Sequence, residues 1–66
     1  MNIGKSINVG CALLNKKKIE LAKNIGKTSV TVSQYISGST QPTAKIIKDM
    51  ADFFEVPASI FISWGE

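Results

Sequence analysis

Four short, uncharged side chains stand close together near the middle of the chain: Ser29, Val30, Ser33 and Gln34. At about 100° per residue they share one side of a helix, with Ser29 at the edge near its start. Such side chains can contact base edges in a DNA groove: Gln34 can pair with adenine, Val30 can touch a thymine methyl group, and serines donate or accept. A helix face in a lysine-rich chain would normally carry Lys or Glu. We therefore predict base-reading residues here; the alternative is an ordinary exposed face.

Residue types that bind phosphate flank this segment. Lys16, Lys17 and Lys18 stand where a helix begins, although lysine is a poor N-cap and positive charge there opposes the helix dipole. A bound phosphate would reverse the sign of that effect, and a solvated run of charges is the alternative. Further candidates for phosphate contacts are Lys27, Thr28, Ser39, Thr40 and Gln41. The remaining lysines, Lys5, Lys23, Lys45 and Lys48, are expected to be solvated.

The parts of an enzyme or a metal site are scarce. The chain has no histidine and one cysteine, Cys11, which we expect to be a small core residue. Gly26-Lys27-Thr28 matches the end of a nucleotide-binding loop, but that motif needs a glycine where Leu21 stands. We predict no enzymatic activity, no catalytic residue, no cofactor, no metal and no small-molecule substrate.

Charge is divided unevenly along the 66 residues. Residues 1–48 hold all eight lysines and one acid, Glu20, which gives +7, whereas residues 49–66 hold four acids and no base, which gives −4. Such a division provides one surface suited to a polyanion. No stretch reaches the ~20 apolar residues of a membrane span, and polar residues interrupt any secretory signal. We expect a cytoplasmic protein with no membrane partner.

Apolar periodicity predicts an all-α chain folded as a single domain over residues 1–66, a compact bundle of five helices. The first helix has the stripe Ile3, Ile7, Cys11 and Leu14, with Gly10 at the close approach of a neighbour. The second carries Ile19, Ala22 and Ile25 on its inner side; a third is capped by Thr28 or Ser29 and runs to about Ser37. Thr43 caps a fourth helix with inner residues Ile46, Ile47, Met50, Ala51 and Phe54, and Pro57 opens a last one that runs to about Ile62.

The second and third of these helices, residues 18–37, form a compact corner with a glycine in its turn. This is the arrangement of a helix-turn-helix, whose second helix can enter the major groove. Ala22 lets the two helices approach, and Gly26 supplies the positive φ of the turn. The residues expected to pack the corner are Leu21, Ala22, Ile25, Gly26, Val32 and Tyr35.

The segment from Lys18 to Gly26, read with Thr28 through Gly38 and then Pro42, resembles the lambda-repressor/Cro-type (Xre-like) helix-turn-helix domains. The resemblance extends from about Leu14 to Phe61. It implies a five-helix, lambda repressor-like domain that binds double-stranded DNA as a transcriptional regulator.

The apolar chain end, Phe61, Ile62 and Trp64, offers a possible contact for a homodimer, which could bind two DNA half-sites. The alternative function is a helical protein-interaction module, such as an antirepressor or an antitoxin-like partner, that does not bind DNA on its own. A steep salt dependence of binding to duplex DNA would distinguish the two.

Overall fold

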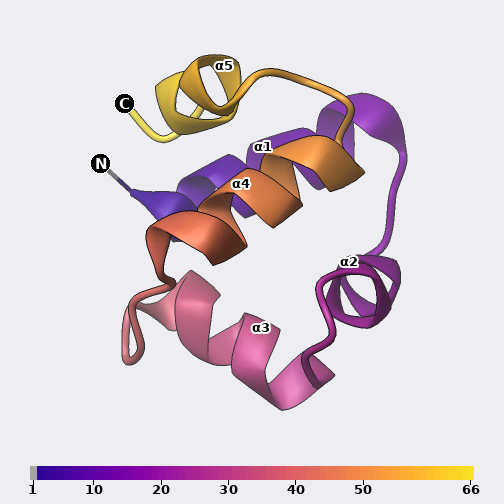
Figure 1. Cartoon of the computed structure of the whole chain (residues 1–66), viewed down its shortest axis with the longest axis vertical. Coiled ribbons are helices and arrows are strands. Elements are labelled where there is room, and N and C mark those ends of the chain that lie inside the picture. Colours follow the sequence, from indigo (N-terminus) through magenta and orange to yellow (C-terminus); the bar gives the residue numbers. More distant parts are fainter. Residues whose placement is uncertain (1) are drawn as a thin grey trace.

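The computed structural model describes residues 2–66, which form five α-helices joined by short connections (Figure 1). The helices are α1 (Ile3–Leu14), α2 (Lys18–Asn24), α3 (Ser29–Ser37), α4 (Ala44–Phe53) and α5 (Ala58–Ser63). No strand occurs in this part of the chain, so the predicted all-α fold is confirmed. Within the same residues, no helix has both the length and the apolar character needed to cross a membrane.

Side-chain caps determine where three of the helices begin. Asn2 caps α1, and its Oδ1 accepts the N–H of Lys5 at 3.0 Å. Thr28 caps α3, as one of the two predicted candidates, through a hydrogen bond of 3.2 Å from the N–H of Thr31 to its Oγ1. Thr43 caps α4 in the same manner. Each cap satisfies a backbone donor that has no partner inside its helix.

Three helices end in the same hydrogen-bonded motif: α1, where Asn15 adopts φ 53° and the N–H of Lys16 donates to the carbonyl of Cys11 at 3.0 Å, and then α2 and α4. After α2, Gly26 adopts φ 73° and the N–H of Lys27 donates to the carbonyl of Ala22 at 2.9 Å. After α4, Glu55 adopts φ 59° and the N–H of Val56 donates to the carbonyl of Ala51 at 3.1 Å. This pattern is the Schellman motif, which needs a left-handed residue just past the helix. Glycine takes that conformation without steric cost, whereas Glu55 is strained there.

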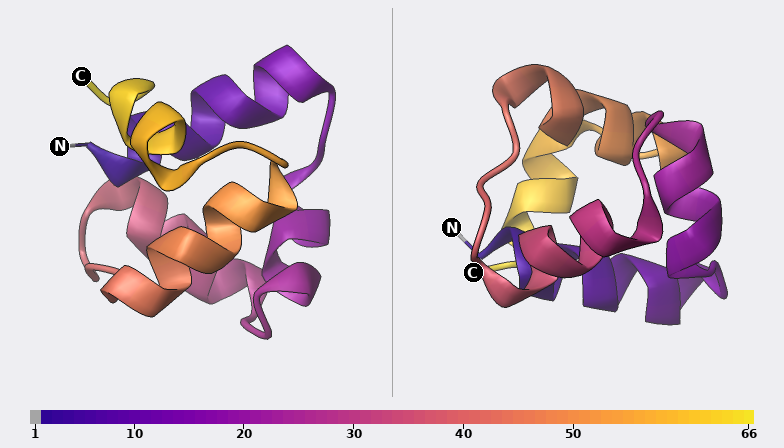
Figure 2. Two further views of the ribbon diagram at one scale, coloured as in Figure 1. Left: turned by 45° about the horizontal axis from the view of Figure 1, so that its top comes forward. Right: turned by 90° about the horizontal axis from the view of Figure 1, so that it is seen from below.

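The five helices pack against one another as a single bundle. α1 crosses the molecule and contacts α3 and α5; α2 contacts α3 and α4, and α4 contacts α5 (Figure 2). The chain end returns to the start of α1, where Gly65 lies against Asn2 and Ser6. The α2–α3 corner and the α4–α5 pair are therefore separate outer parts of one bundle (Figures 1 and 2).

All five helices contribute to the core. Its apolar members are Ile3, Ile7, Cys11, Leu21, Ala22, Ile25, Val32, Tyr35, Met50, Ala51, Phe54 and Phe61. The rings of Phe54 and Phe61 stack with centroids 5.7 Å apart, and Trp64 meets Phe54 edge-on at 5.9 Å. A Cβ at Gly10 would lie 2.8 Å from Cζ3 of Trp64. The predicted close approach at Gly10 is thus confirmed, and its neighbour is the aromatic cluster.

Two residues predicted to face inward are exposed. Leu14 is 41% exposed because α1 ends there and Asn15 turns the chain away with φ 53°. Ile19 is 55% exposed, while Leu21 is fully buried in its place. Two positions apart on a helix is about 200°, so Ile19 and Leu21 cannot both face the core. The short α2 buries the side that carries Leu21, Ala22 and Ile25.

The apolar chain end also differs from the prediction. Phe61 is 0% exposed and lies in the core of its own chain, so it cannot reach a second copy, and its assignment as a dimer contact is wrong. Trp64 is half-buried, with its ring packed against Gly10, Phe54 and Phe61. Ile62 is half-buried at the groove between α4 and α5. The apolar side chains at the chain end therefore pack mainly against the core of their own chain.

Candidate nucleic-acid interface

The corner between α2 and α3 is held by buried side chains. The structure buries Leu21, Ala22 and Ile25 from the first helix and Val32 and Tyr35 from the second. Ala22, at 2% exposed, leaves room for direct contact between the helices. The left-handed Gly26 and the Thr28 cap then set the direction in which α3 leaves the turn. One side of α3 is consequently fixed against the body of the molecule.

The other side of α3 is open to solvent. Ser29, Val30, Ser33 and Gln34 are all exposed, and Val30 is 65% exposed despite its apolar side chain. We call these four residues the α3 face. It carries two hydroxyl groups, one amide and one branched alkyl group, and no charge. The structure thus brings together the four side chains that the sequence pattern assigned to one side of the helix.

The end of α3 is organised by the backbone carbonyl of Gln34. That oxygen accepts the N–H of Gly38 at 3.0 Å and the hydroxyl of Ser37 at 3.1 Å. The hydroxyl groups of Ser37 and Ser39 are 2.8 Å apart, which holds the start of the Ser39–Gln41 connection against the helix end. The side-chain amide of Gln34 makes no hydrogen bond within residues 2–66. It is therefore available to an external partner.

The three consecutive lysines at the start of α2 have different surroundings. The ammonium group of Lys16 lies 4.9 Å from the centroid of the Phe53 ring, a cation–π contact that directs it toward the body. Lys17 is the N-cap, and its N–H donates to Oε1 of Glu20 at 2.9 Å. Because an ammonium group cannot accept a hydrogen bond, only the Glu20 half of a capping box forms. The side chains of Lys17 and Lys18 remain exposed.

The remaining candidates for phosphate contacts also lie at the surface. Lys27 follows the turn glycine and is exposed, as are Ser39, Thr40 and Gln41 after α3. Thr28 is exposed, but its hydroxyl oxygen already caps α3 and lies 3.1 Å from the hydroxyl of Thr31. These residues stand at the two ends of α3, so they border the α3 face without occupying it.

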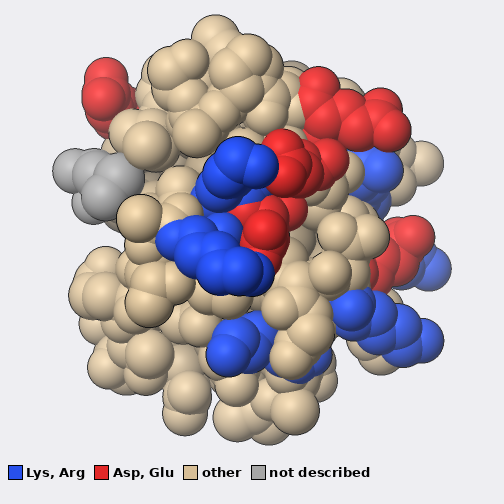
Figure 3. Space-filling model, in the orientation of Figure 1, with Lys and Arg blue, Asp and Glu red and all other residues tan. Residues whose placement is uncertain are grey.

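Ion pairing separates the lysines into two groups. Lys45 pairs with Asp49 at 3.0 Å and Lys48 with Asp52 at 3.4 Å, both along α4. Within residues 2–66, the five lysines of α2 and its two turns have no acid within ion-pair distance: Lys16, Lys17, Lys18, Lys23 and Lys27. Figure 3 shows the paired charges side by side over α4, further lysines toward α2, and a surface without charged side chains at the lower left, toward the end of α3. Uncompensated positive charge thus lies beside the α3 face.

Cys11 belongs to the packing of α1. It is 8% exposed, and burial raises the pKa of its thiol, with the positive charge of Lys18 acting in the opposite direction. A buried thiol with a raised pKa is a poor nucleophile. Residues 2–66 also hold no group of three or more His, Cys, Asp or Glu side chains that could hold a metal ion.

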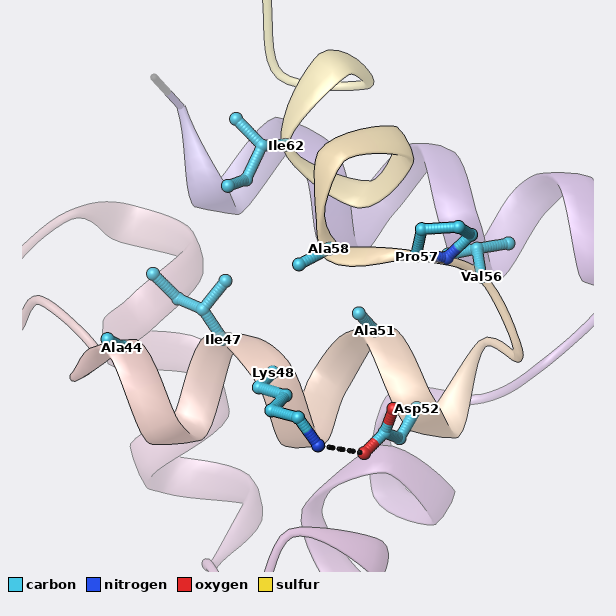
Figure 4. Close-up of a pocket in the computed structure, with 9 residues that line it drawn as sticks. All are labelled: Ala44, Ile47, Lys48, Ala51, Asp52, Val56, Pro57, Ala58 and Ile62. Atoms are coloured by element: carbon cyan, nitrogen blue, oxygen red, sulfur yellow. Dashed lines mark hydrogen bonds and ion pairs between the residues drawn. The ribbon is translucent and has the colours of Figure 1, made fainter.

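One surface feature was not anticipated from the sequence. An apolar groove of about 450 Å³ runs between α4 and α5 (Figure 4). Its walls include Ala44, Ala51 and Ala58, whose short side chains leave the groove open. The sequence shows the three alanines but not the opening, because the opening depends on how far apart the two helices pack. Ile47 and Ala51, predicted on the inner side of α4, both line this groove, and Ile47 is only half-buried.

The fold and the α2–α3 corner define a helix-turn-helix domain, in which a short turn fixes one helix while the next presents a free side. A family model described as Helix-turn-helix matches residues 12–61. Since the match covers more than half of the chain, the protein belongs to this lambda-repressor/Xre-like family of DNA-binding regulatory domains. Comparisons with curated proteins and with solved structures found no match.

Proposed function

We propose that this protein is a sequence-specific regulator of transcription that binds double-stranded DNA with α3 in the major groove. The observation that carries this proposal is the α3 face, which is exposed, uncharged and rich in short side chains. An α-helix fits the major groove, and short side chains let its backbone lie close to the base edges. Membership of the helix-turn-helix family supports the same function.

The two kinds of contact have separate roles in this proposal. Gln34 pairs with an adenine edge, Val30 contacts a thymine methyl group, and Ser29 and Ser33 donate or accept hydrogen bonds. Lys17, Lys18 and Lys27, with the polar residues after α3, bind phosphates and set the position of the helix along the duplex. Affinity then comes largely from lysines and discrimination from the α3 face.

The regulator acts, in this proposal, as a repressor that occupies an operator in the cytoplasm. One helix reaches too few base pairs for high specificity, so two copies bind two half-sites about 34 Å apart. A selection of bound duplexes from a random library, followed by sequencing, tests this arrangement. A recovered pair of half-sites at that spacing supports the dimer, and a single short site contradicts it.

Removal of the Gln34 amide tests base reading. Gln34→Ala is expected to weaken binding to the selected duplex by about 1–3 kcal/mol and to leave binding to random duplex nearly unchanged. Fluorescence anisotropy with both duplexes measures the two affinities. An equal loss on both duplexes would show that Gln34 does not read sequence.

Removal of a lysine tests the phosphate contacts. Lys17→Ala is expected to weaken binding to both duplexes alike and to reduce the slope of log affinity against log salt by about one unit. Lys23→Ala is the matched control, because it removes the same charge from the same helix at a position expected to face solvent. If both variants keep the original slope between about 50 and about 200 mM salt, Lys17 does not contact phosphate.

A further inference from the structure

A polar pocket of about 330 Å³ lies where the start of α1 meets the end of α3. Asn2, Ile3 and Gly4 line it from α1, and residues 35–38 line it from α3, together with Gln41. The two helix ends are in direct contact, because a Cβ at Gly4 would collide with the carbonyl oxygen of Ile36. Figures 1 and 2 show the start of α1 beside the end of α3. No charged side chain of residues 2–66 lines this α1–α3 pocket.

The two helix ends present opposite partial charges to the pocket. At the start of α1, the N–H groups of Ile3 and Gly4 have no acceptor within residues 2–66, because Asn2 caps the third N–H of the helix. At the end of α3, the carbonyl groups of residues 35–37 have no backbone donor in the same part of the chain, since the N–H groups that follow donate to Gln34. One wall therefore attracts an anion and the other a cation.

Tyr35 brings a buried side chain without a partner to the same place. It lines the pocket although it is only 7% exposed, and its hydroxyl makes no hydrogen bond within residues 2–66. The fully enclosed side-chain oxygen without a partner in this part of the chain is that of Ser6, so the Tyr35 hydroxyl reaches open space. The opening that it reaches is the pocket that it lines. Buried tyrosines usually give their hydroxyl a partner, so the missing one indicates a bound molecule.

The chemistry of the pocket matches a free α-amino acid. A ligand with only negative charge would meet the carbonyl groups of α3, and a ligand with only positive charge would meet the N–H groups of α1. A zwitterion carries both signs on one carbon atom, so each charge can face the helix end that attracts it. The volume is that of a small-molecule site. The hydroxyl of Tyr35 and the amide of Gln41 remain for a polar group of the ligand.

We propose that the α1–α3 pocket binds a free α-amino acid with a polar side chain. The ligand carboxylate accepts hydrogen bonds from the N–H groups of Ile3 and Gly4. The ligand ammonium group donates to the carbonyl groups at the end of α3, and Tyr35 and Gln41 hydrogen-bond the ligand side chain. The site goes beyond the proposed DNA binding, because none of the four residues of the α3 face lines it.

Asn2→Asp tests the position assigned to the ligand carboxylate. Aspartate caps a helix as well as asparagine does, and its charge suits a helix start, so the fold is expected to keep its stability. The new carboxylate stands against that of the ligand, so the dissociation constant of the amino acid is expected to rise about tenfold or more. Asn8→Asp is the matched control, because it makes the same change at an exposed position of α1 outside the pocket.

Tyr35→Phe tests the buried hydroxyl. The ring remains, so core packing is preserved, and the lost hydroxyl has no partner within residues 2–66. The dissociation constant of the amino acid is expected to rise about three- to tenfold, with little change in urea unfolding. A loss of stability with unchanged amino-acid binding would show that the hydroxyl serves the fold instead, which contradicts its assigned role.

Nuclear magnetic resonance of the isotope-labelled full chain measures binding. Each of the twenty standard free L-amino acids is added up to about 10 mM, and at least one is expected to give saturable shifts at the N–H groups of Ile3, Gly4 and residues 35–38. The N-acetyl amide of that amino acid lacks both charges and is expected not to bind. Three results would each overturn the site: no saturable shift with any amino acid, equal binding of the N-acetyl amide, or equal constants for Asn2→Asp and Asn8→Asp.

Duplex binding by the same samples separates this site from the proposed function. A chain that binds duplex DNA but no amino acid contradicts only the α1–α3 pocket. A chain that binds an amino acid but no duplex contradicts only the DNA-binding function.

Discussion

The α3 face and the α4–α5 groove, which Lys48 and Asp52 border, both lie at the surface, yet their side chains have opposite character. The α3 face has hydrogen-bonding tips and no charge, and lysines without ionic partners lie nearby. The groove has an apolar floor, and the two lysines of α4 are already paired with aspartates. A lysine beside a polyanion gains by being unpaired, whereas the lysines of α4 already have their charge compensated by aspartates of the same helix. Local pairing of charge thus distinguishes the two surfaces better than net charge does.

The largest expected effect is a loss of fold stability, because both surfaces depend on the folded bundle. Phe54 is 1% exposed and its ring contacts those of Phe53, Phe61 and Trp64. Phe54→Ala is expected to destabilise the fold by about 3–5 kcal/mol, because it opens a cavity in a small core. Urea unfolding measures the loss, and Ile60→Ala, at a 45% exposed position, is the control. Duplex binding that survives complete unfolding would show that the α3 face does not depend on the bundle.

A charge placed on the α3 face separates the two surfaces. Val30→Asp adds a carboxylate where the proposal brings α3 against phosphates and base edges. It is expected to weaken binding to every duplex about tenfold or more and to leave sedimentation without DNA unchanged. Anisotropy and sedimentation of the same sample give both values. Unchanged duplex binding would remove the α3 face from the DNA interface.

The Schellman motifs after α2 and α4 provide a smaller and more local comparison. Gly26→Ala is expected to cost about 1 kcal/mol through its positive φ alone, since an added Cβ would meet nothing within 4 Å. Glu55→Gly is expected to stabilise the fold by about 0.5–1 kcal/mol, because glycine relieves the strain at φ 59°. Urea unfolding of both variants verifies the opposite signs. Destabilisation by Glu55→Gly would mean that the Glu55 side chain contributes more than its backbone costs.

The smallest expected effect is on the ion pairs of α4 in the monomer. Asp52→Asn removes one exposed pair with Lys48 and is expected to cost about 0.3–0.5 kcal/mol. The loss should fall further as salt rises, because exposed charges are screened. Urea unfolding at a low protein concentration, where the chain is monomeric, measures this change in the free energy of unfolding. A cost well above 1 kcal/mol would show that Asp52 supports the fold beyond its exposed pair with Lys48.

Much of the fold could be predicted because its signals are local. Thr28 and Thr43 are strong caps, Gly26 is a strong helix terminator, and the inward positions Val32 and Tyr35 follow from helical spacing. The α3 face could be predicted for the same reason, since its four residues lie within one helix. Ile19 shows where this reasoning ends: a seven-residue helix does not reveal which of two overlapping apolar sides the rest of the chain will bury.

The parts that could not be predicted depend on contacts between distant segments. Phe61 and Trp64 are apolar whether they close a core or join two chains, and only the position of Gly10 and Phe54 decides between these uses. The contact of Lys16 with Phe53 likewise joins residues on different elements. The α4–α5 groove arises from the spacing between two helices, a property that no single helix carries.

The uneven division of charge has a kinetic consequence. Acids lie mostly toward the end of the molecule that carries α5, and lysines without partners lie toward α2 (Figure 3). The protein therefore has an electric dipole, and the field of a nucleic acid exerts a torque on it before contact. That torque turns the α2–α3 end forward during approach, so fewer encounters begin in the wrong orientation and the association rate rises. Added electrolyte shortens the reach of the torque to about 10 Å at 0.1 M, and arrival then becomes a matter of random rotation.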